Sequence, residues 1–402
     1  MYSGAYSKHT ILPYDILQDL THVYENNYRT SVPIDDNTES GEKSAVTPHP
    51  ISAWCRWCVC VFFAGSLIVL TLTVAMYLSL MTVGTLQSKA CVVDLQLPDS
   101  PGCNRDSALC MRKYSDVSYA TMHNAYATTQ DGIVFAQHRA CMRSGLVAGI
   151  RGFMLDVHLT KDGDLKLCHA LCRIGSVSLS STLLMFAEFL EQNPREVLTI
   201  QWEVGYDGLQ DVQQTHRLKL KELFKKAMQD AGLVKYLYVQ PVEQEWPTLQ
   251  AMIDANKRLV SLTDSVTSAD ANWDMYIWNH AFGTPFSNRN RAELERNCRK
   301  NRGTYTNKLF IMNHFTIQGT LSIDNTVLGT VGGVAPVNDI QDINTEPFMW
   351  DRVLACTQCL GRFPNFVAVD FWDSSDVISV THRLNSMPVG SVVQKASQCV
   401  ES

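Results

Sequence analysis

Two histidines carry the chemistry that the sequence suggests. His123 and His169 each lie at or near the end of a short apolar run, and Asp156 ends a third such run between them. Apolar runs of this length predict buried strands. Two imidazoles can cleave a phosphodiester, because one removes a proton from an attacking hydroxyl while the other protonates the departing oxygen. We therefore expect acid–base chemistry on an anionic substrate.

The position of His169 gives it a further advantage as a catalytic group. It lies between Cys168 and Cys172. If these cysteines form disulfides with each other or with neighbours, the backbone of the histidine is fixed, and fixed positioning supplies much of what lowers a catalytic barrier. The alternative is a disulfide-bonded corner that carries an incidental histidine.

Oxygen-bearing side chains accompany the histidines. Asn124 follows His123 directly, and its amide oxygen suits a hard cation such as calcium, although it could equally cap a turn. Asp156 needs a partner if it is buried, and metal, arginine or substrate are the options. Glu203 and Asp370 end two more apolar runs, and either could orient a histidine or bind a cation.

Two other side chains are assigned to substrate binding. Arg151 begins the run that ends at Asp156, and an arginine can stabilise charge that grows on non-bridging oxygens. His314 closes the run Leu-Phe-Ile-Met-Asn and could line the same mouth, although a structural role is an equal alternative.

The elements that must position these groups alternate between strands and helices. The predicted helices include Leu179–Gln192 and Arg217–Ala231, whose apolar residues recur at helical spacing. Such alternation predicts an α/β fold with a parallel sheet, and at this length a closed β/α barrel. A barrel gathers groups from strand carboxyl ends at one mouth. The predicted strands are Val117–Met122, Gly152–His158, Leu165–Cys168, Val197–Trp202, Arg258–Thr263, Lys308–Met312 and Phe366–Phe371.

Composition limits the class of protein. The chain has 402 residues, of which 46% are hydrophobic, a net charge of −6 and a pI near 6. A core of considerable size is possible. No basic excess exists to neutralise a phosphate backbone, so nucleic acid is not an expected partner.

One long apolar stretch predicts a membrane anchor. No charged residue occurs from Trp57 to Ser88, whereas about 20 apolar residues suffice to cross a bilayer. We assign residues 54–86 to a single transmembrane signal anchor, with a buried globular helix as the alternative. Residues 1–53 are polar and predict a disordered cytosolic tail. Within it Tyr14–Leu17 resembles a sorting signal for trafficking adaptors.

The cysteines set the orientation of the chain. Ten of them follow the apolar stretch, an even number that indicates disulfides in an oxidising compartment. Metal binding by Cys356-x-x-Cys359 is a weaker alternative, because a second such pair is missing after the apolar stretch. We therefore expect a single-pass type II membrane protein whose large domain is lumenal or extracellular. Residues 87–112 would form a cysteine-bearing stalk or cap, and residues 113–402 the barrel.

The chain resembles the X-domain of phosphatidylinositol-specific phospholipase C, most closely the single-domain proteins of plants and fungi. The resemblance covers roughly residues 113–385 and implies a distorted TIM-type barrel that acts on phosphodiesters such as phosphoinositides. The segments that carry it are MHNAY, GIRGFMLDVHL, GDLKLCHALC, FLEQNPREVLTIQWEV, EWPTLQAMIDANKRLVSLTD, KLFIMNHF and RFPNFVAVDFW.

The resemblance implies a role for each catalytic candidate. His123 matches the general base that activates the inositol 2-hydroxyl, and His169 matches the acid toward the diacylglycerol oxygen. Asp370 matches the aspartate that supports the first histidine. These correspondences imply a phosphoric diester hydrolase or lyase that acts by two-histidine catalysis.

The resemblance also implies calcium, with one departure. Asn124 and Asp156 match calcium ligands, and the metal-free branch carries an arginine where Asp156 stands. Met154 occupies the position of a glutamate in calcium-dependent members, so the ligand set lacks one carboxylate. Glu203 is the candidate that compensates for it.

Two classes of function follow. The first is a membrane-anchored phosphodiesterase with a phospholipid or inositol-phosphate substrate. The second is a catalytically inactive domain that binds inositol lipids, glycans or a protein partner, and Met154 is its main support. A third interpretation keeps hydrolysis but changes the substrate to sphingomyelin or a glycerophosphodiester.

Overall fold

A computed structural model of the protein describes most of the chain from residue 91 onward and one helix before it. That helix comprises residues 65–76, and its side chains are exposed. Among the described residues, no helix combines the length and the apolar character needed to cross a membrane. The predicted anchor 54–86 lies outside the described residues except for 65–76, and the predicted tail 1–53 with Tyr14–Leu17 lies wholly outside them. The described ranges are 65–76, 91–133, 136–169, 172, 175–206, 214–265, 275–317, 322–323, 326–327 and 342–388.

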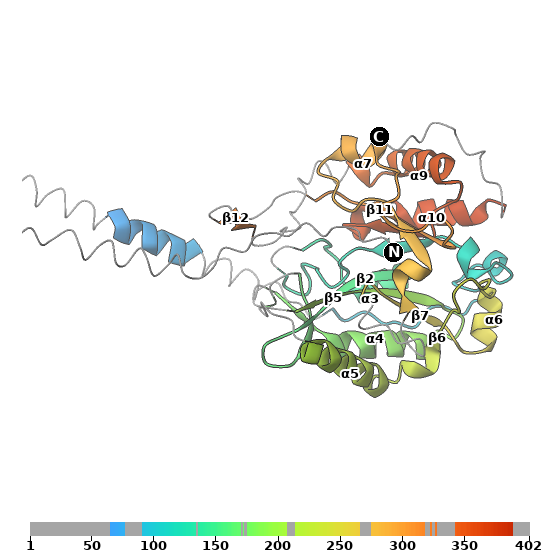
Figure 1. The fold of residues 1–402 in the computed structure, drawn as a ribbon, viewed down its shortest axis with the longest axis horizontal. Helices are drawn as coiled ribbons and strands as arrows, with labels where there is room; N and C mark the ends of the chain where they lie inside the picture. The colour runs from blue at the N-terminus through green and yellow to red at the C-terminus, as the bar shows by residue number, and fades with distance from the viewer. Residues whose placement is uncertain are drawn as a thin grey trace, which may run out of the picture. The chain divides into compact units, whose positions relative to one another are not determined.

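A twelve-stranded, mainly parallel sheet forms the centre of the domain (Figure 1). Its main path runs β10-β9-β11-β14-β1-β2-β5-β7-β6, with β3, β4 and β8 attached beside it. The strands are β1 (Tyr119–Met122), β2 (Gly152–Leu159), β3 (Leu165–Leu167), β4 (Val177–Ser178), β5 (Leu198–Tyr206), β6 (Leu237–Tyr238), β7 (Leu259–Thr263), β8 (Met275–Tyr276), β9 (Ala281–Gly283), β10 (Arg302–Gly303), β11 (Leu309–His314) and β14 (Phe366–Val369). All seven predicted strands are present.

The sheet that the structure describes is an open curl rather than a closed barrel. Neighbouring strands from β9 to β6 on the main path run parallel, and β10 pairs antiparallel to β9. Within the described residues, no ladder joins β9 or β10 to β6 or β8. The prediction of a parallel α/β sheet is confirmed, whereas closure of that sheet is not observed.

Strand alternation divides the sheet into an inner and an outer face. On β2, Phe153 and Leu155 belong to the apolar cluster that includes the helices. Met154 and Asp156 therefore face the inside of the curl. On β5 the same rule places Ile200 outward with that cluster.

Helices cover the outer face (Figure 1). The α4 helix has the predicted bounds, and it begins where the side chain of Ser178 accepts a hydrogen bond from the Ser181 amide. Its apolar stripe, which includes Phe186 and Phe189, is buried. The helices are α3 (Met142–Ala148), α4 (Leu179–Gln192), α5 (Gln214–Asp230), α6 (Leu249–Asp254), α7 (Arg291–Arg296), α9 (Glu346–Leu360) and α10 (Val377–Ser386).

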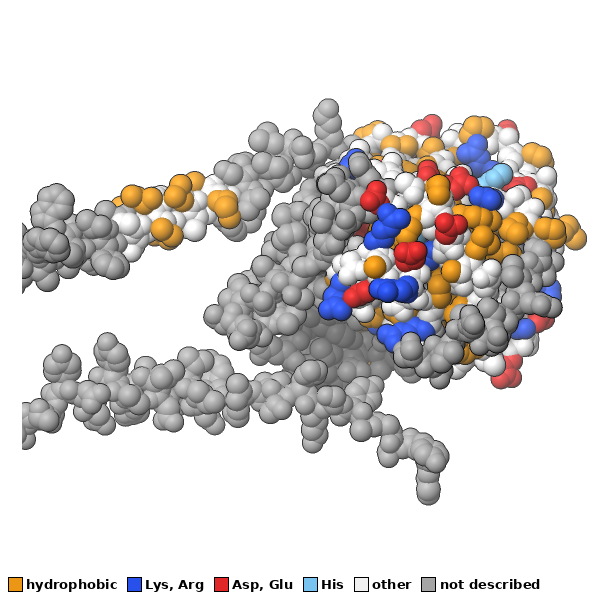
Figure 2. All heavy atoms as spheres, turned by 90° about the horizontal axis from the view of Figure 1, so that it is seen from above, with side chains coloured by type: hydrophobic (Ala, Val, Ile, Leu, Met, Phe, Trp, Pro, Cys, Tyr) orange, Lys and Arg blue, Asp and Glu red, His pale blue; other side chains and the backbone are white. Residues whose placement is uncertain are grey.

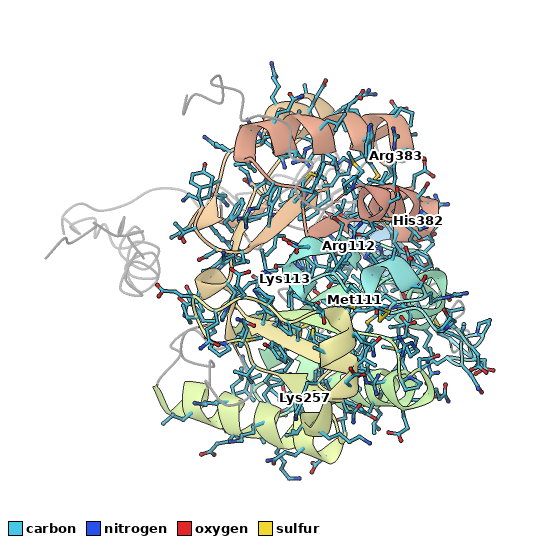
Figure 3. All side chains as sticks on the ribbon, turned by 90° about the vertical axis from the view of Figure 1, so that its right-hand side faces the viewer. Met111, Arg112, Lys113, Lys257, His382 and Arg383 are labelled. Atoms are coloured by element: carbon cyan, nitrogen blue, oxygen red, sulfur yellow. A yellow bond between two sulfur atoms is a disulfide. The ribbon has the colours of Figure 1, made fainter. Side chains whose placement is uncertain are left out.

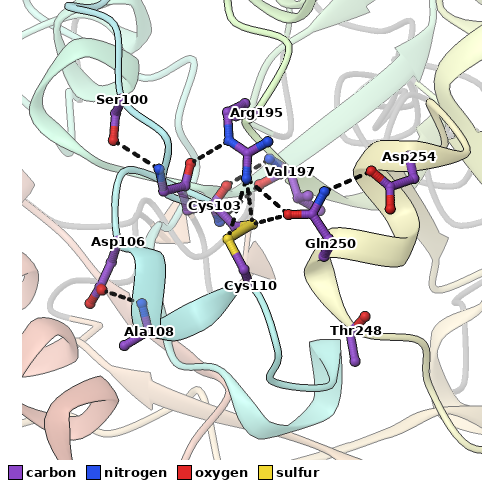
Figure 4. Close-up of a disulfide and its surroundings, with 12 residues drawn as sticks. Ser100, Cys103, Asp106, Ala108, Cys110, Arg195, Val197, Thr248, Gln250 and Asp254 are labelled. Atoms are coloured by element: carbon purple, nitrogen blue, oxygen red, sulfur yellow. Dashed lines mark hydrogen bonds between the residues drawn. A yellow bond between two sulfur atoms is a disulfide. The ribbon is translucent and has the colours of Figure 1, made fainter.

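The segment predicted as a stalk or cap packs onto the domain. Leu95 and Cys103 are fully buried. Cys103 forms a disulfide with Cys110, and Arg195 donates to the Gly102 carbonyl at 3.1 Å and to Gln250 Oε1 at 2.9 Å (Figure 4). This part of the chain is therefore a fixed cap of the barrel.

Disulfides confirm the reading of the cysteines. All nine cysteines that the structure describes after the apolar stretch are disulfide-bonded. Because Cys356 is bonded to Cys298, it is not available as a metal ligand in the Cys356-x-x-Cys359 motif. The pairs are Cys91–Cys141, Cys103–Cys110, Cys168–Cys172 and Cys298–Cys356, and Cys359 is also disulfide-bonded.

The described side chains on the face shown in Figure 2 carry charges of both signs, interspersed with apolar residues. This mixture agrees with the small net charge of the chain. It does not resemble the basic surface that binds nucleic acid.

Candidate active site

The first histidine lies at the junction of two adjacent parallel strands. His123 follows β1, Asp370 follows β14, and the His123 amide donates to the Val369 carbonyl at 3.0 Å. The two side chains meet, with His123 Nδ1 2.8 Å from Asp370 Oδ1. The Phe315 ring stacks on the imidazole at 3.7 Å between centroids. The imidazole is therefore fixed in both position and ring plane.

Sharp turns follow both strands. Asn124 and Phe371 have positive φ values of 45° and 51°. Few residues other than glycine adopt the left-handed region, although asparagine tolerates it. Such conformations gather at functional sites, where the surrounding structure holds them in place. Here they direct the chain away immediately after His123 and Asp370.

The second histidine is connected to the inward carboxylate of β2. His169 Nδ1 lies 3.2 Å from Asp156 Oδ2, and the Tyr126 hydroxyl donates to the same oxygen at 2.8 Å. The Cys168–Cys172 disulfide encloses His169, so of the pairings left open by the sequence the two cysteines form the one with each other. The His169 side chain is 40% exposed, whereas that of His123 is 16% exposed. His169 is thus the outer group and His123 the inner one.

The amide of Asn124 faces Asp156. With the amide nitrogen turned toward the carboxylate, Asn124 donates to its two oxygens at 3.3 and 3.2 Å. With the oxygen turned the same way, an amide oxygen and a carboxylate would converge on one point. That second arrangement is suited to a cation rather than to a hydrogen bond.

Further carboxylates line the strands beside Asp156. Glu203 is its register partner on β5, and Asp264 follows β7, where its carboxylate accepts from the Val204 amide at 3.2 Å. Part of Glu203 is exposed to solvent. Its carboxyl group is nevertheless surrounded by protein atoms, and this burial, together with the charges of Asp156 and Asp264, raises its pKa to about 7. Burial likewise raises the pKa of Asp264 to about 6.

An arginine that the sequence did not single out lies among these acids. The charge of Arg302 on β10 lowers the pKa of both Glu203 and Asp264. Its guanidinium carbon lies 4.4 Å from the centroid of the Phe286 ring and 5.6 Å from that of the Trp278 ring. No local motif marks Arg302, because it lies in a two-residue strand that only tertiary pairing defines.

The donor set at Asp156 fits a hard cation in chemistry. Asn124, Asp156 and Glu203 would supply one amide and two carboxylate groups, which are oxygen ligands of the kind that calcium prefers. Among the described residues, however, no group of three or more His, Cys, Asp or Glu side chains is arranged to hold a metal ion. An unpartnered amide, that of Gln201, lies one inward position below Glu203 on β5.

Arg151 does not lie at this site. It precedes β2, at the opposite end of that strand from the mouth, and it is 3% exposed. Its Nε donates to Glu196 Oε2 at 2.6 Å, and its Nη1 donates to the carbonyls of Leu146 and Ile150. The assignment to substrate binding is therefore replaced by a structural role, because the side chain is enclosed and bound to Glu196 and two backbone carbonyls.

His314 is also turned away from the mouth. It is the last residue of β11, and alternation places Asn313 inward and His314 outward, against α9. Its ring contacts the Ile343 carbonyl through Nε2 and Arg352 through Nδ1, at 2.8 and 3.1 Å. Burial, followed by the charge of Arg352, lowers its pKa to about 3. A structural histidine, the alternative considered from sequence, is what the fold contains.

Comparison with known proteins gives consistent matches. The family model PI-PLC X 1 matches residues 109–385. "PI-PLC X domain-containing protein 1" of Arthroderma benhamiae is 26% identical over 301 residues, covering 71% of this chain and 90% of that protein. A PI-PLC X domain-containing protein of Arabidopsis thaliana is 27% identical over 353 residues, covering 77% and 74%. An "uncharacterized secreted protein" of A. benhamiae is 24% identical, and the chain covers 64% of its length.

Solved structures of phosphatidylinositol-specific phospholipase C from Staphylococcus aureus are also similar. One is 14% identical, with a TM-score of 0.43, and covers 69% of this chain and 94% of that chain. A mutant form has a TM-score of 0.44 at the same identity. The match of the family model over most of the described domain shows that the chain belongs to the PI-PLC X family.

Proposed function

We propose that the protein is a phosphodiesterase that cleaves a phosphoinositide-like headgroup by two-histidine catalysis. The observation that carries this proposal is the juxtaposition of two histidine–carboxylate pairs, His123 with Asp370 and His169 with Asp156. They come from strands that are adjacent in the sheet or follow one another closely in the chain. In each pair the contact with the carboxylate is made by Nδ1, so Nε2 is the nitrogen that would exchange a proton with substrate.

The geometry suggests which histidine acts as the base and which as the acid. With Nδ1 hydrogen-bonded to Asp370, His123 presents Nε2 as a base. That nitrogen accepts the proton of a ring hydroxyl, whose oxygen bonds to phosphorus. The bond from phosphorus to the lipid oxygen then breaks, and the more exposed His169 gives that oxygen a proton. The product is a cyclic inositol phosphate, and addition of water with the proton transfers reversed would open the ring.

Replacing Asp370 by asparagine is expected to lower kcat for headgroup release from phosphatidylinositol vesicles. An amide can donate to Nδ1 and so move the imidazole proton to Nε2, which removes the base. We expect a loss of about 10² to 10⁴-fold in kcat with an unchanged KM. Release of water-soluble inositol phosphate measures it. Asp351→Asn, at an exposed position on α9, is the matched control. Equal losses in both variants would contradict the orienting role.

We propose calcium as the cofactor, held by Asn124, Asp156 and Glu203. When bound there, the ion would stabilise negative charge on the non-bridging phosphate oxygens. Without an ion, the carboxylates of Asp156 and Glu203 repel each other, since the charge of Asp156 contributes to the raised pKa of Glu203. The amide of Asn124 lies against the Asp156 carboxylate, so rotation of the amide would turn its oxygen toward the same point.

Glu203→Gln should therefore have opposite effects without and with calcium. The pKa of Glu203 rises from 4.5 in the unfolded chain to about 7, so the folded state binds more protons between these pH values. Stability falls as pH rises through this window. At pH 8 in chelator, we expect the variant to gain about 1 kcal/mol, a value reduced for the solvent exposure of Glu203. The gain should vanish near pH 4.5.

With millimolar calcium at pH 8, the unfolding free energy of the wild type should rise more than that of Glu203→Gln. Urea denaturation in chelator and in calcium measures the unfolding free energy of each protein without and with the ion. Glu222→Gln, on the exposed side of α5, is the control and should change neither. A wild-type protein that calcium does not stabilise would exclude the cation from the proposal.

The alternative is a catalytically inactive domain that binds inositol lipids, glycans or a protein partner. Met154 favours it, because this inward position beside Asp156 carries a thioether where a charged ligand would serve an ion. Binding of inositol phosphate without any turnover, in a protein that calcium does not stabilise, would establish this alternative. Detectable turnover that depends on His123 would exclude it.

We further propose that the charge-free stretch from Trp57 to Ser88 anchors the protein as a type II membrane protein. The disulfides support a lumenal or extracellular catalytic domain, as does the secreted relative. A phospholipid in the same membrane would then be within reach. Release of the full-length protein from membranes by alkaline carbonate would contradict the anchor.

A further inference from the structure

One buried amide inside the curled sheet has no hydrogen-bond partner among the residues that the structure describes. Gln201 on β5 is 4% exposed, and neither its Oε1 nor its Nε2 forms a hydrogen bond. Leaving a buried polar group unsatisfied costs about 1 to 3 kcal/mol. Such groups in native proteins usually mark a bound ligand or water, because folding alone does not favour them.

Gln201 belongs to the inner face that carries the site. It lies two residues before Glu203, on the same side of β5. Its register partners are Met154 on β2 and Leu262 on β7, both uncharged. Met154 lies two residues before Asp156, so Gln201 is below the pair of carboxylates, toward the floor of the curl.

A second unpartnered atom lies on the other side of His123. Asn313 on β11 is 7% exposed; its Nδ2 donates to the Thr284 carbonyl at 2.7 Å, but within the described part of the chain its Oδ1 has no partner. In the sheet order, β11 and β5 each lie two strands from β1, which leads to His123. The Phe315 ring, two residues after Asn313, stacks on His123 and so places this part of β11 beside the histidine.

These groups have the chemistry of a receptor for ring hydroxyls. A carboxamide both donates and accepts, as a hydroxyl does, and a free amide oxygen accepts one more hydroxyl. A phosphate ester at the level of Gln201 would have the uncharged side chains of Met154 and Leu262 as its strand neighbours, and burying its charge against them is unfavourable. The floor therefore suits a neutral polyol.

We propose that Gln201 binds a ring hydroxyl of the headgroup and selects headgroups whose ring is not further phosphorylated there. Asn313 supplies a second acceptor from the opposite side. The inference deepens the proposed function, on which it rests for the identity of the headgroup. It assigns the deep side of the site to the ring, whereas the more exposed His169 faces the lipid oxygen.

Gln201→Met in the full-length protein tests this. Methionine has a similar length and removes the unsatisfied amide, so we expect Tm to rise by about 2 °C or more. Affinity for myo-inositol 1-phosphate, measured by calorimetry, should fall about tenfold or more, because the ring hydroxyl loses its partner. Affinity for glycerol 1-phosphate, which has no ring, should be low and unchanged. Wild type should bind inositol 1,4,5-trisphosphate about tenfold more weakly than the monophosphate.

The matched control is Thr357→Val on α9. Thr357 is fully buried and its hydroxyl also has no partner, but it lies outside the curl. Thr357→Val should raise Tm, as Gln201→Met should, and leave the binding of inositol 1-phosphate unchanged. These ligands are not substrates, so binding is measured whether or not the protein turns over. Unchanged inositol 1-phosphate affinity in Gln201→Met, absent binding in wild type, or equal affinity for the trisphosphate would each overturn the proposal.

Discussion

Replacing His123 by alanine is expected to lower headgroup release from phosphatidylinositol vesicles by about 10² to 10⁴-fold. The imidazole is the only part of residue 123 that could take the hydroxyl proton. Its orientation is fixed by Asp370, whose Oδ1 lies 2.8 Å from Nδ1, and by Phe315, whose ring centroid lies 3.7 Å from that of the imidazole. No solvent molecule has that fixed orientation, so the loss should appear in kcat. Initial rates at saturating vesicle concentration, with calcium present, measure it.

The control for this variant is another histidine of the same domain. His382 lies exposed on α10 (Figure 3), and His382→Ala should retain full activity. Because His123 is partly buried beneath Phe315, the alanine variant also requires a stability measurement. A His123→Ala protein that is folded, binds inositol 1-phosphate and hydrolyses lipid at the wild-type rate would refute the catalytic proposal.

His123, Asp156 and Asp370 could be placed from the sequence because parallel strands make the inference short. Once a run is recognised as a buried strand, the residue at its carboxyl end lies at a known edge of the sheet. Neighbouring strands then bring such residues together without any long-range information. The contact of His123 with Asp370 depends only on β1 and β14 being adjacent, although 247 residues separate the two side chains.

The same rule fails where the face of the strand matters. Asn313 and His314 are consecutive, so one must point inward and the other outward. Sequence alone does not say which of the two side chains points inward. In the structure, Arg352 on α9 contacts the His314 ring and holds it on the outer side of the sheet. The role of Arg302 was hidden for another reason. Its strand, β10, is defined only by pairing with β9, and no local sequence pattern predicts that pairing.

Gln201 illustrates a third limit. Amides at inward positions are ordinary in barrels, and only the lack of any partner distinguishes this one. That property belongs to the assembled interior and cannot be deduced from the run Leu-Thr-Ile-Gln-Trp. Closure of the barrel could not be deduced either, because it depends on whether the edge strands meet, and β6 and β8 are only two residues long.

Arg151→Met should destabilise the protein by about 3 to 5 kcal/mol, the usual effect of removing one partner of a buried ion pair. Arg151 and Glu196 are 4% and 5% exposed at the side chain, and 2.6 Å separates Nε from Oε2. Without the guanidinium, the Glu196 carboxylate stays buried and unpaired. Two carbonyls, those of Leu146 and Ile150, lose their donor as well. Urea denaturation at neutral pH measures the change.

A second substitution separates a structural role from substrate binding. Arg151→Met/Glu196→Leu removes both charges, and because apolar pairs often replace buried ion pairs without loss, most of the stability should return. A structural Arg151 therefore predicts strong coupling between the two positions and an unchanged KM in whichever variant is folded at low temperature. A substrate-binding Arg151 predicts the reverse, namely a raised KM that Glu196→Leu does not restore and little change in unfolding free energy. The enclosure of this arginine at the far end of β2 from Asp156 is the reason to expect the first result.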